Sequence, residues 1–266
     1  MSTNNSIKDI NEFIDNGSIT SQQILVVSLC FIFNMLDGFD ITAMAVVASP
    51  VSVDLALTPD LLGWIFSFAL AGMMVGAMAL APIADIIGRR ALIILSLMIV
   101  GISVIMTSKV ESLTPFMLLR FISGMGAGAL LASQASLAAE YSPDKYRALS
   151  VAIVTAGYPT GAMMTSVVAG YILPEYGWRM MFLFGGVVTV SMVIVAWLMI
   201  PESLKYLIEK KPNNALEKIN KILLKLNAPS ISELPPSNND REVTVSMIGN
   251  MRMLLSPKFR RLSLML

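Results

Sequence analysis

The feature that most constrains this chain is a succession of apolar segments, each about as long as a membrane is thick. Five of them hold no charged side chain and a sixth holds only two aspartates; together they cover residues 23–49, 61–84, 91–108, 121–139, 148–174 and 180–201. An α-helix needs about 20 mainly apolar residues to cross the hydrocarbon core, and it satisfies its backbone hydrogen bonds internally. The sequence therefore predicts an all-α membrane protein with a six-helix transmembrane bundle at 23–201.

The composition excludes several classes of protein. Charged residues make up 14% of the 266 residues, whereas soluble domains carry about 25%. The net charge of +1 gives no reason to expect a nucleic acid partner. With no histidine and a single cysteine, Cys30, the chain lacks the ligands for a histidine or cysteine metal site and cannot form an internal disulfide. No nucleophile–base pair or phosphate loop is recognisable, so we expect neither an enzyme nor a cofactor.

The segments outside the bundle differ in character. Residues 1–22 form a polar tail without the basic start and apolar core of a signal peptide, so the first span is expected to stay uncleaved. Within a cytoplasmic segment at 202–257, residues 204–226 have the spacing of an amphipathic helix, and a flexible, proline-containing stretch follows. Residues 258–266 resemble the start of a seventh span that is cut off.

The distribution of basic residues predicts the orientation. Arg89 and Arg90 join the second and third spans, Lys145 and Arg147 join the fourth and fifth, and Lys205 follows the sixth. Short loops rich in lysine and arginine stay in the cytoplasm. The sequence therefore predicts an integral protein of the bacterial inner membrane with a cytoplasmic N-terminus.

Two carboxylates interrupt the first span. Asp37 and Asp40 lie in the run 34–41, which begins with Asn34, and are the only charged side chains from residue 24 to 53. An ionised carboxylate in hydrocarbon costs at least about 2.5–3.5 kcal/mol, so we expect both to face a hydrated cavity inside the bundle. They share one helix face, and their mutual repulsion favours a proton on one of them near neutral pH. A purely structural cap or pair is the alternative.

Arg120 lies at the edge of the fourth apolar segment, at a depth that suits a partner on the first span. It is seven residues, about 10 Å, inside its helix, and Asp40 lies about 15 Å below the same membrane surface at 1.5 Å per residue. An ion pair between them is therefore expected, with one carboxylate left to accept a proton. Arg120 is also suited to bind an anionic solute, or it extends to the interface as a snorkelling arginine.

Small residues recur at a spacing of four within the spans. Such pairs let helices approach closely, and either static packing or a sliding surface explains them. Tyr158-Pro159 lies inside one pair, where a helix break and a phenol facing the cavity are expected. The pairs are Gly72/Gly76, Gly124/Gly128 and Gly157/Gly161.

The loop after the second span carries the motif Asp85-x-x-Gly88-Arg89-Arg90. The orientation of the chain in the membrane accounts for the two arginines, because cytoplasmic loops are rich in them. It does not account for an acidic residue at a helix end followed by a glycine. The motif resembles the loop signature of the major facilitator superfamily, from which it departs at Ala81 and Ile86.

Further segments carry the same resemblance, which runs from about residue 20 to 226. Within the superfamily, residues 36–40 are similar to the aromatic acid:proton symporter family, the 4-hydroxybenzoate type of carrier. The other segments are Arg120-x-x-x-Gly124-x-Gly126, Glu140-Tyr-Ser-Pro143 with Arg147, Gly177-Trp-Arg179 and the run 201–206.

The resemblance implies twelve helices in two six-helix bundles with the solute site between them. This chain would hold the N-terminal half, and its partners would be a small anionic substrate, a proton, the lipid bilayer and a missing C-terminal half. The loop signature would contact that other half, so Asp85, Arg89 and Glu140 are expected to lack partners here. The residues implied in conformational gating are Asp85, Gly88, Arg89, Arg90, Glu140 and Arg147.

We therefore expect a secondary transporter for the uptake of aromatic acids such as hydroxybenzoates, with the proton as coupling ion. Asn34, Asp37, Asp40, Arg120 and Tyr158 are expected to form the site for substrate and proton. Alternatives are a proton-coupled porter for another organic acid, a sugar or a drug, and a truncated fragment without transport activity.

Overall fold

The computed structural model describes residues 19–234, which are helical for most of their length. The expected start of a seventh span at 258–266 and most of the polar tail lie outside the described residues. Two short helices at one end of the bundle follow the longer ones. The helices are α2 (Ser21–Asp54), α3 (Pro59–Val75), η1 (Gly76–Leu80), η2 (Ala81–Ile83), α4 (Ala84–Ile87), α5 (Arg89–Thr107), α6 (Leu113–Tyr141), α7 (Asp144–Met199), α8 (Leu204–Lys210) and α9 (Ala215–Lys225).

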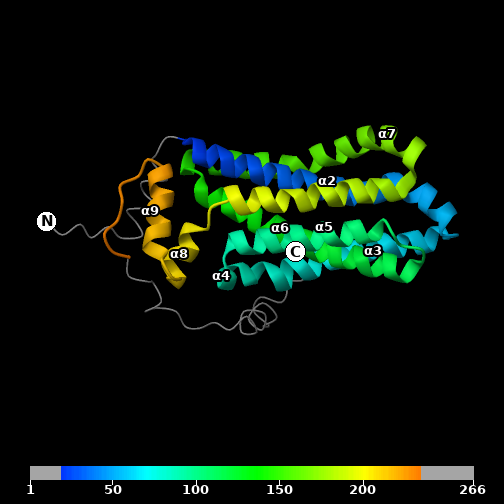
Figure 1. Cartoon of the computed structure of the whole chain (residues 1–266), viewed down its shortest axis with the longest axis horizontal. Coiled ribbons are helices and arrows are strands. Elements are labelled where there is room, and N and C mark those ends of the chain that lie inside the picture. Colours follow the sequence, from blue (N-terminus) through cyan, green and yellow to red (C-terminus); the bar gives the residue numbers. More distant parts are fainter. Residues whose placement is uncertain (1–18, 235–266) are drawn as a thin grey trace, which may run out of the picture.

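Five helical stretches of the described chain are long and apolar enough to cross a membrane. The longest, α7, has 56 residues and contains non-helical torsion angles at Gly177 (φ 72°, ψ 179°). Figure 1 shows that α7 turns back there, so that its two arms run in opposite directions along the bundle. These arms contain the window 148–174 and all but the last two residues of the window 180–201. The all-α membrane fold predicted from the sequence is confirmed.

Local sequence signals explain where several helices begin. Thr20 caps α2 through a capping box, in which its hydroxyl accepts from the Gln23 backbone N–H and the Gln23 side chain accepts from the Thr20 N–H. Pro59 opens α3 at a position where its missing N–H costs nothing. Gly88, at φ 98°, separates α4 from α5 because this backbone conformation strains other residues.

Glycines bring pairs of helices into backbone contact. A Cβ atom on Gly72 would lie 2.1 Å from the Phe121 carbonyl oxygen, so α3 and α6 touch there. A Cβ on Gly161 would lie 1.8 Å from the Met35 carbonyl oxygen, which joins α7 to α2. The packing interpretation of the small-residue pairs is confirmed, and the sliding surface stays a prediction.

The break expected at Tyr158-Pro159 is wrong. Helix α7 continues through both residues, and its only non-helical torsion angles are at Gly177. Neighbouring helices can satisfy backbone groups that a proline frees, and Asn34 on α2 donates to the carbonyl of Val154, in the turn before Pro159.

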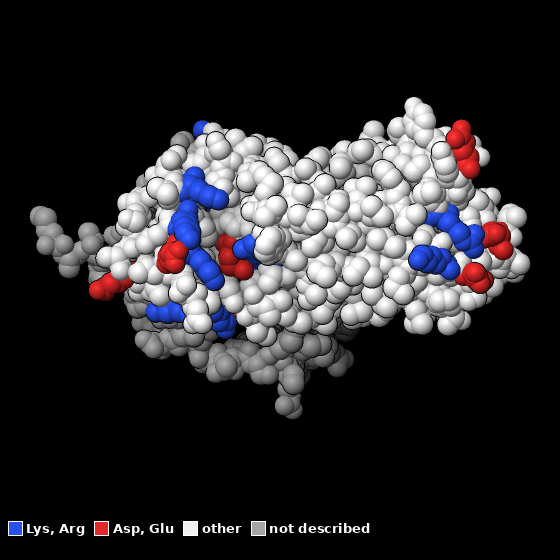
Figure 2. Space-filling view, viewed as in Figure 1, with Lys and Arg blue, Asp and Glu red and all other residues white. Residues whose placement is uncertain are grey.

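Charged side chains gather at the two ends of the long axis, and the surface between them is almost free of charge (Figure 2). Such an uncharged band suits a bilayer that surrounds the middle of the bundle. At one end, α9 lies across the long axis (Figure 1) and buries Ile219, Ile222 and Leu223 against the core. The amphipathic helix predicted at 204–226 is therefore present, divided into α8 and α9.

Candidate functional site

A buried ion pair joins α2 to α6. Arg120 Nη1 donates to Asp40 Oδ1 across 3.0 Å, and the two residues are 2% and 6% exposed. The pairing expected from their matched depths is present. Arg120 does not extend to the interface, so the snorkelling alternative is wrong.

Two further helices contact the Arg120 guanidinium. Its Nη2 lies 3.5 Å from the Thr107 hydroxyl at the end of α5. Its Cζ lies 4.9 Å from the centre of the Phe182 ring, on the second arm of α7, a distance at which an aromatic ring attracts a cation. Arg120, on α6, is therefore in contact with side chains from α2, α5 and α7.

Asp37 lies on the same face of α2, and no cation among the described residues pairs with it. It is 2% exposed, and neither of its oxygens has a hydrogen-bond partner among residues 19–234. Asn34, one turn earlier and fully buried, uses its amide nitrogen on the Val154 carbonyl at 2.7 Å and leaves its oxygen unpaired. Two carboxylates and one guanidinium therefore share the interior, with one negative charge in excess when both acids are ionised.

A cavity of about 220 Å³ opens beside the ion pair, between α2, α3 and α6. Asp40, Arg120 and Ser123 are its polar and charged lining residues. The remaining wall is apolar and includes Ile65 and Phe66. Such a cavity suits a small molecule with a charged group at one end and an apolar body.

Tyr158, the remaining residue predicted for this site, lies on the first arm of α7. A Cβ on Gly38 would lie only 2.1 Å from the Tyr158 carbonyl oxygen. The glycine between the two aspartates therefore lets α7 approach α2 at the depth of the acidic pair. The phenol is half-buried.

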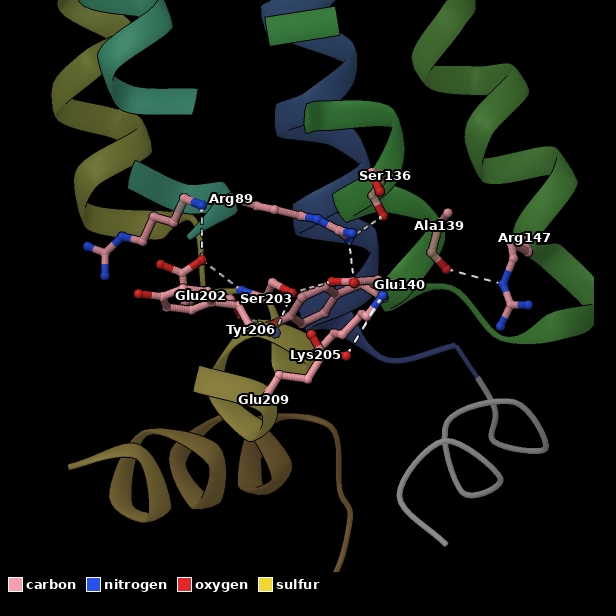
Figure 3. A network of polar contacts seen from close by, with 12 residues as sticks. Arg89, Ser136, Ala139, Glu140, Arg147, Glu202, Ser203, Lys205, Tyr206 and Glu209 are labelled. Atoms are coloured by element: carbon pink, nitrogen blue, oxygen red, sulfur yellow. Dashed lines mark hydrogen bonds and ion pairs between the residues drawn. The ribbon is translucent and has the colours of Figure 1, made fainter. Parts of the chain in front are cut away.

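The loop after α4 belongs to a polar network at the α8–α9 end (Figure 3). Arg89 forms an ion pair with Glu140 at the end of α6, and the Ser203 hydroxyl donates to the other Glu140 oxygen at 2.6 Å. The expectation that Arg89 and Glu140 lack partners is wrong, because each finds its partner within this bundle. Asp85 is exposed and lines a surface pocket with Arg89.

Glu202 anchors the other side of this network. Its Oε1 accepts from the backbone N–H groups of Arg90 and Ser203, both at 3.0 Å, and burial raises the pKa of its carboxyl above the ordinary range. A Cβ on Gly88 would lie 2.5 Å from a Glu202 oxygen, which explains the glycine of the loop motif. The Arg90 guanidinium donates to the Trp197 carbonyl.

The sixth residue predicted for gating, Arg147, lies at the edge of this network, at the start of α7 (Figure 3). It forms an ion pair with Asp144 at 2.5 Å, three residues earlier, and donates to the Ala139 carbonyl at 3.3 Å. Both contacts are local to the turn between α6 and α7.

Three residues near the ion pair or along α6 escaped the sequence analysis. Thr107 and Phe182 contact Arg120 but carry no signal in an apolar segment. Gln134, fully buried on α6, has neither amide atom paired among the described residues. An amide within the charge-free window 121–139 is a signal that could have identified it.

Comparison with known proteins gives the same picture as the motifs. The chain is 30% identical to the 4-hydroxybenzoate transporter PcaK of Pseudomonas putida over 215 residues, 81% of this chain and 48% of that protein. It is 29% identical to the gallate transporter of Pseudomonas putida, over 75% of this chain and 44% of that one. The chain therefore spans about half the length of these relatives. That they are transporters supports the prediction that it is not an enzyme.

Solved structures agree on the fold. The proton:xylose symporter XylE bound to 6-bromo-6-deoxy-D-glucose superposes with a TM-score of 0.71 at 18% identity, over 78% of this chain and 50% of that one. The family model described as Major Facilitator Superfamily matches residues 30–262. Since this match covers most of the sequence, the chain belongs to the Major Facilitator Superfamily and is an integral membrane protein.

Proposed function

We propose that this chain forms one bundle of a carrier that moves an aromatic carboxylate across the membrane together with a proton. The observation that carries the proposal is the charge arrangement inside the bundle. Asp37 is buried and has no hydrogen-bond partner among residues 19–234, one helical turn before Asp40 of the Asp40–Arg120 ion pair. A cavity lined by both members of that pair and otherwise mainly by apolar side chains lies beside them.

The charges explain how a proton and an anion would depend on each other. While Asp40 is ionised it occupies part of the Arg120 guanidinium, which is also the group best suited to hold a substrate carboxylate through two parallel hydrogen bonds. A proton on Asp40 removes that competition. Asp37, without a cation, is the second place for the proton, which would cancel the excess negative charge.

The choice of an aromatic acid rests on the relatives and on the cavity. Two relatives are named for 4-hydroxybenzoate and gallate, and Phe66 and Ile65 line the same cavity as the charged pair. A flat apolar ring with one carboxylate matches both features.

We further infer that the N-terminus is cytoplasmic and that the membrane is a bacterial inner membrane, from the lysines and arginines at the α8–α9 end. A second six-helix bundle is the partner we infer for α3 and the first arm of α7. The apolar window of α3 is only 17% buried, and Leu70 and Tyr171 are 61% and 79% exposed. Such faces suit helix packing.

Uptake of radiolabelled 4-hydroxybenzoate by vesicles that hold the chain, alone and with the C-terminal half of the Pseudomonas putida relative, tests the proposal. Accumulation should require an inward proton gradient and should be inhibited by unlabelled benzoate but not by an aliphatic dicarboxylate. Asp37→Asn should abolish accumulation while labelled substrate still exchanges with unlabelled substrate, because exchange needs no net proton movement.

Asp60→Asn is the matched control. Asp60 is an exposed carboxylate in the first turn of α3, and its replacement should leave accumulation at the wild-type level. Proton-driven accumulation that survives Asp37→Asn and Asp40→Asn would refute the assigned proton site. Equal inhibition by aliphatic acids would refute the aromatic substrate.

A further inference from the structure

A second pocket, of about 220 Å³, lies at the α8–α9 end between α9 and the end of α7. Its walls carry four basic side chains, Arg90, Lys218, Lys221 and Lys225, and one acidic side chain, Glu202. This surplus of positive charge suits an anion. None of these residues lines the cavity beside Asp40 and Arg120.

The three lysines of α9 form one basic face. Residues at positions i, i+3 and i+7 of a helix project to the same side, which is the spacing of Lys218, Lys221 and Lys225. All three are exposed, and Lys221 also pairs with Glu217 at 2.6 Å. Figure 2 shows basic side chains gathered over α9 beside a hollow, where the charged end meets the uncharged band.

Two buried donors line the same pocket without an acceptor. Gln22 is 8% exposed, and its Nε2 has no hydrogen-bond partner among residues 19–234; the same holds for the buried Nε of Arg90. A buried N–H without an acceptor is unfavourable, so both groups point to an oxygen ligand. Glu202 accepts through its Oε1 from the backbone N–H groups of Arg90 and Ser203, and it forms no hydrogen bond with either of these two side-chain donors.

The pocket continues into an apolar surface. Leu198 and Met199 line it, and Ile194, Trp197 and Leu198 are 62%, 61% and 68% exposed. Ile194, Trp197 and Leu198 lie at i, i+3 and i+4, on one face of the second arm of α7. A ligand with its anion in the pocket would therefore have its apolar part along the uncharged band.

We propose that this pocket binds the phosphate of an anionic phospholipid, whose acyl chains lie on the exposed face of α7. Lysine and arginine near a membrane surface attract anionic lipids. The bound phosphate would connect α9 to the first turn of α5, which carries Arg90. Inorganic phosphate offers the same oxygens without acyl chains, and the apolar surface favours the lipid.

Native mass spectrometry of the detergent-purified chain with phosphatidylglycerol, phosphatidylcholine or inorganic phosphate tests this site. The wild type should bind phosphatidylglycerol in preference to the other two probes. The α9 triple variant, Lys218→Gln/Lys221→Gln/Lys225→Gln, should bind it about a hundredfold more weakly. Gln22→Leu, which removes one donor and no charge, should bind it about threefold more weakly.

The matched control replaces three other exposed lysines of the same end, Lys145, Lys210 and Lys211, by glutamine. It changes the net charge equally and should keep wild-type lipid binding. Equal weakening in the α9 triple variant and this control would overturn the site. Phosphatidylglycerol binding no tighter than phosphatidylcholine binding, with inorganic phosphate bound through the same lysines, would overturn the lipid and identify a free-phosphate site.

Discussion

Replacing Arg120 by glutamine tests whether the interior charges are arranged as described. Arg120 is the only cation that contacts Asp40 in the described part of the chain, and both residues are almost fully buried. The lost hydrogen bond is worth about 0.6–2 kcal/mol between membrane helices. The larger effect comes from Asp40, which would remain as a buried carboxylate without a partner.

The free energy of burying that carboxylate without a partner has an upper limit, because the group can bind a proton rather than stay ionised. At pH 7 this costs about 4 kcal/mol from the reference acidity of aspartic acid, and at pH 5 about 1.5 kcal/mol. We therefore expect Arg120→Gln to destabilise the chain by about 3–5 kcal/mol at pH 7, as breaking one side of a buried pair usually does. The destabilisation should shrink as the pH falls, because protonation becomes cheaper.

Thermal unfolding in detergent, followed by the amount of protein that stays monodisperse, measures this effect. A loss of about 3–5 kcal/mol lowers Tm by about 6–20 °C for a chain of this size. Asp37→Asn is the control, since it removes the unpaired charge and leaves the Asp40–Arg120 pair intact. The reasoning would be refuted if Arg120→Gln were as stable as Asp37→Asn. It would also be refuted if Arg120→Gln lost the same stability at pH 5 as at pH 7.

Two further predictions concern packing and a titrating group. Gly38→Ala should destabilise the chain by about 1–3 kcal/mol, because its Cβ would meet the Tyr158 carbonyl oxygen; Gly170→Ala, with open space around its Cβ, should cost nothing in the same Tm assay. Burial raises the pKa of Glu202, so the folded state loses stability as the pH rises above about 4.5. Glu202→Gln should therefore raise Tm at pH 8 and leave it unchanged at pH 4. Replacement of the exposed Glu217 by glutamine, the control, should not raise Tm at pH 8. An equal rise in Tm at both pH values for Glu202→Gln would contradict the raised pKa of Glu202.

The ion pair shows what sequence reasoning could reach. The rise of a helix per residue is fixed, so positions in the sequence place Asp40 and Arg120 at matching depths. The direction of each side chain around its helix depends on how the helices are rotated against one another. For that reason Thr107 and Phe182, which complete the surroundings of Arg120, could not be predicted.

The loop network shows where a motif misled. The resemblance assigned Arg89 and Glu140 to contacts with another bundle, but the two side chains pair with each other. Ser203, which donates to Glu140, lies 63 residues away along the chain. Contacts of this kind arise only when α5, α6 and the segment after α7 meet at one end of the bundle.

The amino-acid sequence alone determined the number and length of the apolar spans and the presence of two acids within the first. This is possible because each segment in lipid must satisfy its backbone hydrogen bonds internally. The tertiary structure decided that Asp40 pairs with Arg120 while no cation within residues 19–234 pairs with Asp37, and that Gln22 and Arg90 share a pocket with α9. Those outcomes depend on helix rotation and close approach, which the neighbouring helices impose together.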